Sequence, residues 1–309
     1  MLFPLLGNVK KRAALVPVFL MLFGAFPLFG ESLLEKADRL EEDLQYHEGL
    51  ALLKEALPGI SDNRKLAEVY WRLSRFQLLV TDELRRQDAH RDRLLEGYEA
   101  GREYADKSLE LAPGNYKAYY WRGSNIGRWG QSRGVLSALF RASDMRDDLE
   151  RAIEANPAHG DSYYVLGMLY NTVPGGIVSF GSSEYAVSLG RKSLEYQEGP
   201  DPKYSYYLEL AKSLWDRNWN NRRRNSRHDS KRADYLRARS QLEKAFHYEG
   251  MVDFSTPLPY ASQGVARMSD RDEARAIANW LQRELQRKRD KTPGEQDTFK
   301  EVQELLNSW

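Results

Sequence analysis

The side chains best suited to metal binding or acid–base chemistry in this 309-residue chain are five histidines. They are His47, His90, His159, His228 and His247, and no two of them have the spacing of a zinc-binding HExxH helix. The chain has no cysteine, which excludes disulfides and thiol chemistry. Nucleophile-elbow, phosphate-loop and dinucleotide-binding motifs are also missing from the sequence. We therefore expect a protein that is not an enzyme and binds no metal or cofactor, unless catalytic residues converge from distant segments.

A row of aromatic and polar side chains offers a different chemistry, that of binding. Trp71, Tyr120, Tyr164 and Leu208 each follow directly after a tyrosine. Rings that line one concave surface suit a stacking or apolar ligand, or a peptide laid along them. The alternative is that these rings only pack against neighbouring helices. The candidate residues for binding a ligand or partner are Trp71, Arg75, Tyr120, Ser124, Tyr164, Met168, Asn171, Phe180 and Trp215.

Helical pairs would position this row, and residues 149–170 carry the clearest signature of one. A small residue, a proline, an aromatic, a Leu-Gly pair and a second tyrosine occur there in that order. This order is typical of a tetratricopeptide (TPR) helical pair, which must stack on further copies to bury its apolar face. The motif residues and their counterparts are Ala152, Pro157, Tyr163, Leu166, Gly167 and Tyr170; Ser108, Pro113, Tyr119 and Gly123; Ser193, Pro200, Tyr207 and Ala211; and, in part, Tyr70, Ser74, Leu242, Ala245 and Phe246.

The spacing of the copies is longer than in a simple TPR array. Tyr119, Tyr163 and Tyr207 are 44 residues apart, whereas a TPR repeats at about 34. The 15 residues from Ala152 to Gly167 are ordinary, so the excess of roughly 7 to 15 residues lies between the first and second helix of each repeat. We predict an all-α, TPR-like helical-repeat solenoid with enlarged intra-repeat connections along one edge. A HEAT or armadillo array, with a period of about 40–47, is the alternative.

The first 30 residues have the layout of a targeting segment. Lys10, Lys11 and Arg12 precede an uncharged apolar stretch over residues 13–29, and Gly30 is followed by a charged helical segment. This layout is typical of a secretory signal peptide, and an uncleaved N-terminal anchor is the alternative. We therefore expect residues 1–30 to be a signal peptide or anchor, and the protein to be periplasmic or otherwise exported. Residues 31–309 should form a single solenoid domain, with residues 270–309 as C-terminal capping helices.

Three further segments stand out from the repeats. Residues 81–93 are strongly charged and predict a solvent-exposed helical extension. Residues 173–183 are apolar and rich in glycine, which favours a structured turn packed on the helices over a lid that contacts a ligand. Residues 217–239 are basic, but the whole chain carries a net charge of only +1. We expect this basic segment to be a long solvated connection, with an anionic-surface site as the alternative and nucleic acid as an unlikely partner.

Residues 105–215 resemble the TPR-type T-component (TatT-like) associated with periplasmic TRAP transporters, and also the related microtubule-dynamics regulator family of helical repeat proteins. The element that carries the resemblance is PGGIVSFGSSEYAVSLGRKSLE at residues 174–195, and GPDPKYSYYLELAKSL after it is similar too. For a T-component, the resemblance implies a non-enzymatic periplasmic partner of a solute-binding protein, with an internal pocket for an apolar ligand. Family T-components are often lipoproteins, and this chain lacks the cysteine for such an anchor.

These observations lead to two functional hypotheses. The first is an exported scaffold that binds a protein partner, such as a periplasmic solute-binding protein, or a small apolar ligand in its concave groove, as an accessory to TRAP-type solute uptake. The second is a purely structural scaffold of the envelope that binds a peptide or helix of another protein. Membrane association would then come only from an uncleaved N-terminus, and a homo-oligomer is compatible with both.

Overall fold

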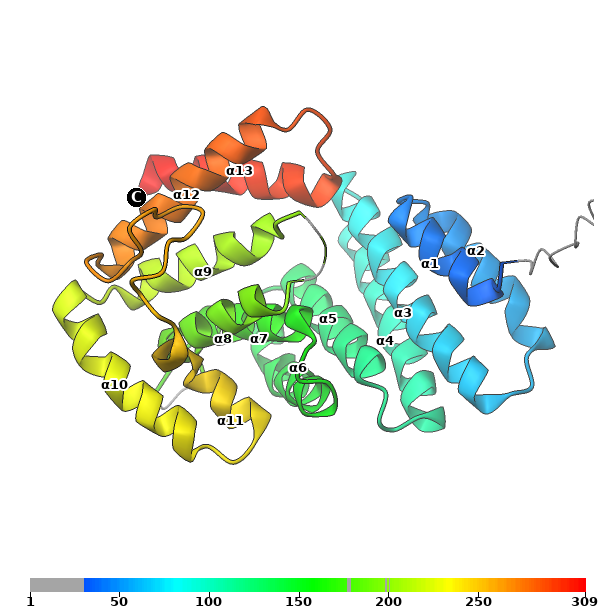
Figure 1. Cartoon of the computed structure of the whole chain (residues 1–309). Helices are drawn as coiled ribbons and strands as arrows, with labels where there is room; N and C mark the ends of the chain where they lie inside the picture. Colours follow the sequence, from blue (N-terminus) through cyan, green and yellow to red (C-terminus); the bar gives the residue numbers. More distant parts are fainter. Residues whose placement is uncertain (1–30, 177–178, 198, 200) are drawn as a thin grey trace, which may run out of the picture. The chain divides into compact units, whose positions relative to one another are not determined.

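The computed structural model describes residues 31–176, 179–197, 199 and 201–309, apart from the side chains of residues 135–138. The compact unit formed by residues 33–309 is all-α and built as a helical repeat, as the periodicity predicts (Figure 1). In the described residues the α-helices are α1 (Leu33–Glu42), α2 (Tyr46–Ala56), α3 (Asn63–Arg86), α4 (Arg91–Leu111), α5 (Tyr116–Arg133), α6 (Val135–Ala155), α7 (Gly160–Thr172), α8 (Ser183–Glu195), α9 (Tyr204–Arg217), α10 (Asn221–Arg237), α11 (Gln241–Phe246), α12 (Asp270–Arg287) and α13 (Pro293–Ser308).

Three consecutive helical pairs form the body of this unit. Helix α3 packs on α4, α5 packs on α6, and α7 packs on α8, and each pair packs on the next. The fourth pair differs from the sequence prediction, because α12 and not the segment around Ala245 is the main partner of α9. Tyr207 and Leu210 of α9 share a buried apolar cluster with Ile277 and Leu281 of α12. Helix α11, which contains Ala245, packs on α8, α10 and α6 instead.

The additional residues of the long repeats lie where the first helix of a pair meets the second. Most of them extend these two helices instead of forming a loop between them. Helices α3 and α4 are 24 and 21 residues long, and α5 and α6 are 18 and 21. Only Gly134 separates α5 from α6, at a φ of 111°, where a residue with a Cβ would be strained. A longer connection is present between α7 and α8, where it spans residues 173–182.

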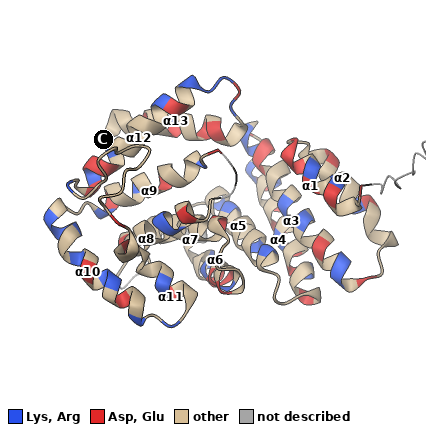
Figure 2. Cartoon of the chain, in the orientation of Figure 1, with Lys and Arg blue, Asp and Glu red and all other residues tan. Residues whose placement is uncertain are grey.

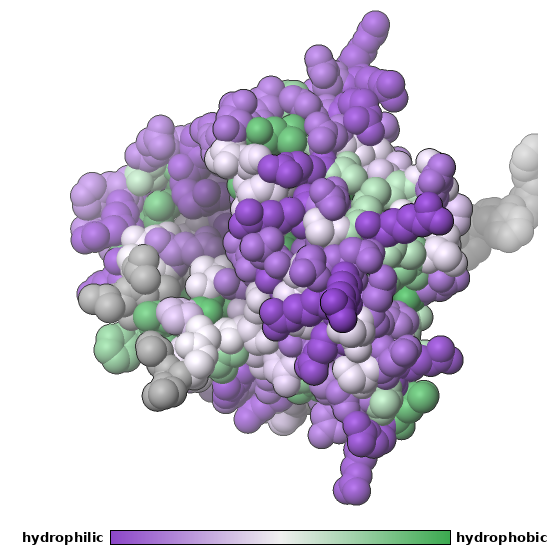
Figure 3. Space-filling model, turned by 90° about the vertical axis from the view of Figure 1, so that its left-hand side faces the viewer, coloured by the Kyte–Doolittle hydropathy of each residue, from purple (hydrophilic) through white to green (hydrophobic). Residues whose placement is uncertain are grey.

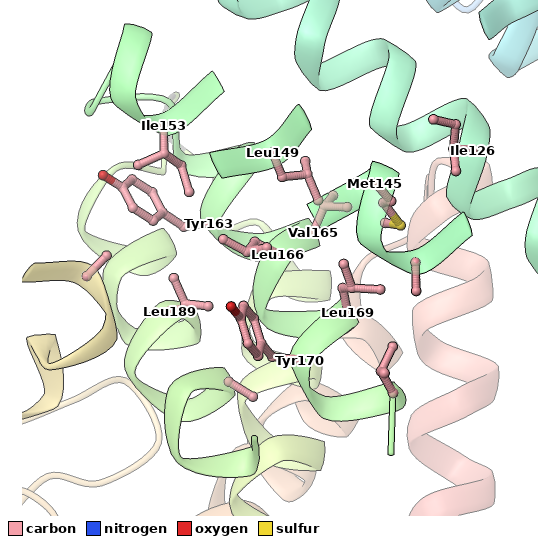
Figure 4. Packing of buried hydrophobic residues seen from close by; sticks show 14 residues of the cluster. Ile126, Met145, Leu149, Ile153, Tyr163, Val165, Leu166, Leu169, Tyr170 and Leu189 are labelled. Carbon is pink, nitrogen blue, oxygen red and sulfur yellow. The ribbon is translucent and has the colours of Figure 1, made fainter. Parts of the chain in front are cut away.

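The tyrosine of the motif, Tyr163, lies in the buried cluster that joins α6, α7 and α8 (Figure 4), and the glycine, Gly167, lies where α7 meets α8. A Cβ added to Gly167 would meet Leu189 Cβ at 3.3 Å and Ala186 O at 3.4 Å, so α7 and α8 pack closely at this glycine. Tyr163 is 1% exposed, and its hydroxyl donates a hydrogen bond to Pro157 O at 2.8 Å. These residues are structural, as the register of the motif indicates.

The basic segment is a helix whose inner face is buried, so the prediction of a solvated connection is wrong. Arg224 and Lys231 are seven residues apart on α10, which puts them on the same face two turns apart. Both are buried, as is Arg217 at the end of α9. Asn218 follows with a left-handed φ of 52°, which ends α9 and lets the chain turn into α10.

These cations belong to a buried ion network with carboxylates from distant segments. Arg217 donates to both oxygens of Asp270 at 2.8 Å and to Glu249 Oε1 at 2.9 Å. Arg224 donates to Glu273 Oε2 at 2.6 Å, and Lys231 donates to Glu249 Oε2 at 2.8 Å. Burial alone would raise the pKa of Glu249, but the facing cations hold that pKa well below 4.5. The network therefore fixes α10 and the segment before α12 against α9.

The predicted targeting segment, residues 1–30, lies outside the described residues. Among the helices that the structure describes, none is both long enough and apolar enough to cross a membrane.

Candidate functional site

A groove of about 680 Å³ runs along the first helices of the successive pairs. Helices α3, α5, α7 and α9 each contribute to its wall, and α13 contributes from the C-terminal end. These helices share one face because every first helix of a stacked repeat has the same orientation in the solenoid. The groove is within the usual size range of ligand sites, about 300–1,000 Å³.

Four of the nine predicted binding residues line this groove. They are Tyr120 and Ser124 of α5 and Tyr164 and Met168 of α7. In each helix the two residues are four apart, so they lie one turn apart on the same face. Leu78 and Leu208, which the same register places inward, line the groove as well.

Trp71 and Arg75 lie outside the groove, on the part of α3 that precedes the groove residues Leu78, Arg85 and Arg86. Arg75 Nη2 donates to Asp38 Oδ1 at 2.7 Å. The indole of Trp71 is 2% exposed and is covered by the guanidinium of Arg72, 4.2 Å from the ring centroid. Both side chains are therefore structural, because Arg75 is held by Asp38 of α1 and Trp71 is covered by Arg72 of its own helix.

The other three predicted residues also have partners elsewhere. Asn171 donates to Asp216 Oδ2 at 2.7 Å. Phe180 packs edge-on against Tyr170, with the ring centroids 5.4 Å apart. Trp215 stacks on Trp309 at 4.4 Å, nearly parallel at 7°. The glycine-rich connection thus contributes Phe180 to the apolar core around Tyr170, which agrees with a turn packed on the helices.

The two groove tyrosines are held in fixed positions. Tyr120 is edge-on to Trp121 and to His159, each at 4.9 Å, and Tyr164 stacks on Tyr206 at 4.7 Å. Burial raises the pKa of Tyr120 well above its usual value and that of Tyr164 to about 12. Both phenols are therefore neutral at physiological pH and able to donate hydrogen bonds. The hydroxyl oxygen of Ser124, one turn beyond Tyr120 on α5, is buried as well.

Charged side chains of both signs surround these tyrosines. On one wall Arg128 approaches Asp82 at 3.1 Å, and the Asp82 carboxylate also accepts from Tyr98 at 2.6 Å. On the other wall Lys212 lies 2.9 Å from both Glu209 and Glu301. Burial opposes the charge of Lys212, but the two carboxylates raise its pKa, so it stays protonated. The groove thus offers paired charges and neutral phenols, which suits binding by complementarity of shape and charge.

Helix α13 is the part of the groove that the sequence did not predict. Asp297, Lys300, Glu301 and Glu304 face the groove, at spacings of three and four residues that define one side of a helix. The opposite side of α13, with Val302 fully buried, packs on α9 and α12. This amphipathic pattern is visible in the sequence, but it indicates a capping helix and does not say which surface its polar side completes.

Asp297 links α13 back to the beginning of the array. Arg86 of α3 donates to Asp297 Oδ2 at 3.1 Å, across 211 residues of sequence. Arg85 and Arg86 line the groove, although residues 81–93 predict a solvated extension. Thr81 and Asp82 are buried, because α4 and the α5 side chain Arg128 cover this part of α3. The groove is therefore bounded at both ends of the helical array.

A second, apolar cavity of about 360 Å³ lies between α5, α6 and α7. Its lining includes Ile126, Leu139, Leu169 and Val173, and the residues that it shares with the groove are Gly127, Gln131, Met145 and Met168. Within the described residues there is no group of three or more His, Asp or Glu side chains that could hold a metal ion.

Comparison with known proteins relates the N-terminal part of the chain to one family. The family described as "Regulator of microtubule dynamics protein 1-3" matches residues 33–173, which include α1 to α7. Regulator of microtubule dynamics protein 1 of Pongo abelii is 30% identical over 138 residues, covering 45% of this chain and 41% of that protein. The Bos taurus protein of the same name is 29% identical over 143 residues, covering 46% and 43%. The matched region spans less than half the length of either relative.

This match corrects the resemblance drawn from residues 105–215. That segment resembles a TRAP transporter T-component, but the matching family and both relatives are microtubule-dynamics regulators. The T-component assignment is therefore wrong, and the TRAP uptake role that depended on it is withdrawn. The similarity to the microtubule-dynamics regulator family, drawn from the same residues, is the one that the comparison supports.

Proposed function

We propose that this protein is a non-catalytic binding protein whose groove holds a segment of a partner protein. The observation that carries the proposal is that residues from six helices, α3, α5, α6, α7, α9 and α13, converge on one groove, with neutral phenols between charged walls. A peptide supplies backbone groups for the tyrosine hydroxyls and side chains of both charges for Arg128 and Glu209. Buried aromatic anchors surrounded by paired charges are typical of the centre of a protein interface.

A peptide-binding experiment with groove-filling variants tests this proposal. Peptides selected from a random library on the full chain should bind in the groove, and Gln131→Trp and Lys300→Trp should each weaken their binding about 30-fold. The two residues line the groove from α5 and α13, and both are exposed, so a larger side chain there should not disturb the core. Titration calorimetry would give the dissociation constants.

Gln286→Trp on α12 is the matched control, because Gln286 is exposed and is not part of the groove lining. Its peptide affinity should equal that of the unmodified chain. Equal affinity in all three variants, with unchanged unfolding midpoints, would show that the peptides bind elsewhere and would overturn the proposal.

The names of the relatives favour a second candidate, an effect on microtubule dynamics. We propose it for residues 33–173, which the family model matches. The full chain added to purified tubulin should change the rate or extent of polymerisation followed by turbidity. Unchanged polymerisation at saturating protein would refute this candidate and leave the peptide-binding proposal standing. Export through residues 1–30 is a separate proposal that does not depend on either.

A further inference from the structure

The outer face of α10 is a basic surface that the groove does not use. Helix α10 lies at the left edge of the unit in Figure 1, and Lys and Arg recur along it in Figure 2. Arg224 and Lys231 point into the buried ion network, so the other arginines of the helix supply its outer charge. The exposed arginines of α10 are Arg222, Arg223, Arg227, Arg232 and Arg237.

The exposed charge on this helix is positive although the whole chain is nearly neutral. Leaving out the buried Arg224 and Lys231, five arginines stand against Asp229 and Asp234 on this helix, 5 − 2 = +3, and from outside the helix Glu184 of α8 approaches Arg227 at 3.6 Å. Asp234 accepts a hydrogen bond from Arg237 at 2.6 Å, and only Asp229, at 98% exposure, faces solvent without cover. The positive charge is therefore local to α10 and suits an anionic surface.

Two exposed apolar side chains accompany the arginines. Leu236 is 68% exposed and follows Arg232 by one helical turn. Gly250 packs so tightly on α10 that an added Cβ would lie 2.2 Å from Arg232 N, which brings Met251, 40% exposed, beside the same arginine. Figure 3 shows the side of the unit on which α10 lies, where small apolar patches are scattered among hydrophilic side chains.

The apolar side chains distinguish between anionic partners. Surfaces that bind single-stranded nucleic acid combine basic side chains with exposed aromatic rings that stack on bases. Trp219, next to α10, is 5% exposed and is covered by the guanidiniums of Arg217 and Arg223, at 4.3 and 4.7 Å. A lipid bilayer instead offers phosphate groups for arginines and an acyl region for leucine and methionine.

We propose that the outer face of α10, with Leu236 and Met251, binds the surface of a membrane that contains anionic lipids. The arginines would contact lipid phosphates while the two apolar side chains enter the headgroup boundary. The buried network makes the helix a rigid platform, since Arg224 and Lys231 hold its inner face to Glu273 and Glu249. Helix α10 lies outside residues 33–173, so this property would belong to the part of the chain beyond the family match.

Vesicle sedimentation with the full chain tests the proposal. The protein should bind phosphatidylcholine vesicles containing phosphatidylserine more strongly than vesicles of phosphatidylcholine alone, and added salt should weaken the difference. Arg222→Gln and Arg232→Gln should each lower the partition coefficient about fivefold. Leu236→Ser should lower it by a similar factor, because its apolar contact with the bilayer is lost.

Arg283→Gln on α12, another exposed arginine, is the matched control and should bind like the unmodified chain. All of these proteins carry residues 1–30, so differences between them report on α10 and not on the apolar N-terminal segment. Equal binding to vesicles with and without phosphatidylserine would overturn the proposal. So would an equal loss of binding in Arg222→Gln and Arg283→Gln. A third result would also overturn the proposal and assign the surface to an anionic polymer. In that case the arginine variants lose binding, Leu236→Ser has no effect, and the unmodified chain binds polyglutamate or DNA tightly.

Discussion

Replacing Arg217 by alanine is expected to lower the free energy of unfolding by about 3–5 kcal/mol. The Arg217 side chain is 1% exposed and donates to both Asp270 and Glu249, whose side chains are 0% and 4% exposed. Without the guanidinium, two buried carboxylates lose a shared partner in a region that water does not reach. The cost is larger than that of a surface ion pair, because the carboxylates left behind stay desolvated.

Urea unfolding followed by circular dichroism would measure this loss. The control is Arg237→Ala on α10, since the Arg237 side chain is 77% exposed and pairs with Asp234 only at the surface. That change should stay within about 0.5 kcal/mol of the unmodified protein. Equal, small effects of the two substitutions would mean that the network is hydrated and does not hold α10 in place.

Leu166→Ala is expected to cost about 2–5 kcal/mol of stability, the second large effect. Leu166 is fully buried in the cluster that includes Leu149, Ile153 and Leu189, from α6 and α8 (Figure 4). Truncation would leave a cavity where two helical pairs meet, and the long helices around it can close that cavity only in part.

The same unfolding assay would compare Leu166→Ala with Leu236→Ala. Leu236 is 68% exposed on α10, so its truncation should change the free energy of unfolding by less than about 0.5 kcal/mol. A loss of under about 1 kcal/mol at Leu166 would contradict the structural role of the Leu-Gly pair in joining the repeats.

The periodicity of the motif predicts the fold and the inward-facing side of each first helix. It places Tyr120 and Tyr164 on the groove because the residue after the packing tyrosine points to the concave side in α5, α7 and α9. It misplaces Trp71 and Arg75, because register fixes the face of a helix but not how far the groove extends along it. Helix α3 is 24 residues long, and only its C-terminal part lines the groove.

Contacts between distant segments explain the remaining differences. The sequence of α10 does not show that this helix has a buried face. Arg224 pairs with Glu273 and Lys231 with Glu249, and both glutamates lie outside the helix. Asn171, near the C-terminal end of α7, donates a hydrogen bond to Asp216. Trp215, near the C-terminal end of α9, stacks on Trp309. No local pattern encodes such pairings, since Asn171 and Asp216 are 45 residues apart in the sequence and Trp215 and Trp309 belong to opposite sides of α12 in chain order.

Site-specific photocrosslinking tests the central claim, that the groove binds a segment of a partner protein. Benzoylphenylalanine would be placed at Gln131 in the groove and, in a separate protein, at Gln286 on the outer side of α12. Each protein would then be irradiated with a peptide selected on the unmodified chain, and the adduct mapped by mass spectrometry. We predict an adduct from position 131 and none from position 286. An adduct from position 286 with none from position 131 would contradict the claim.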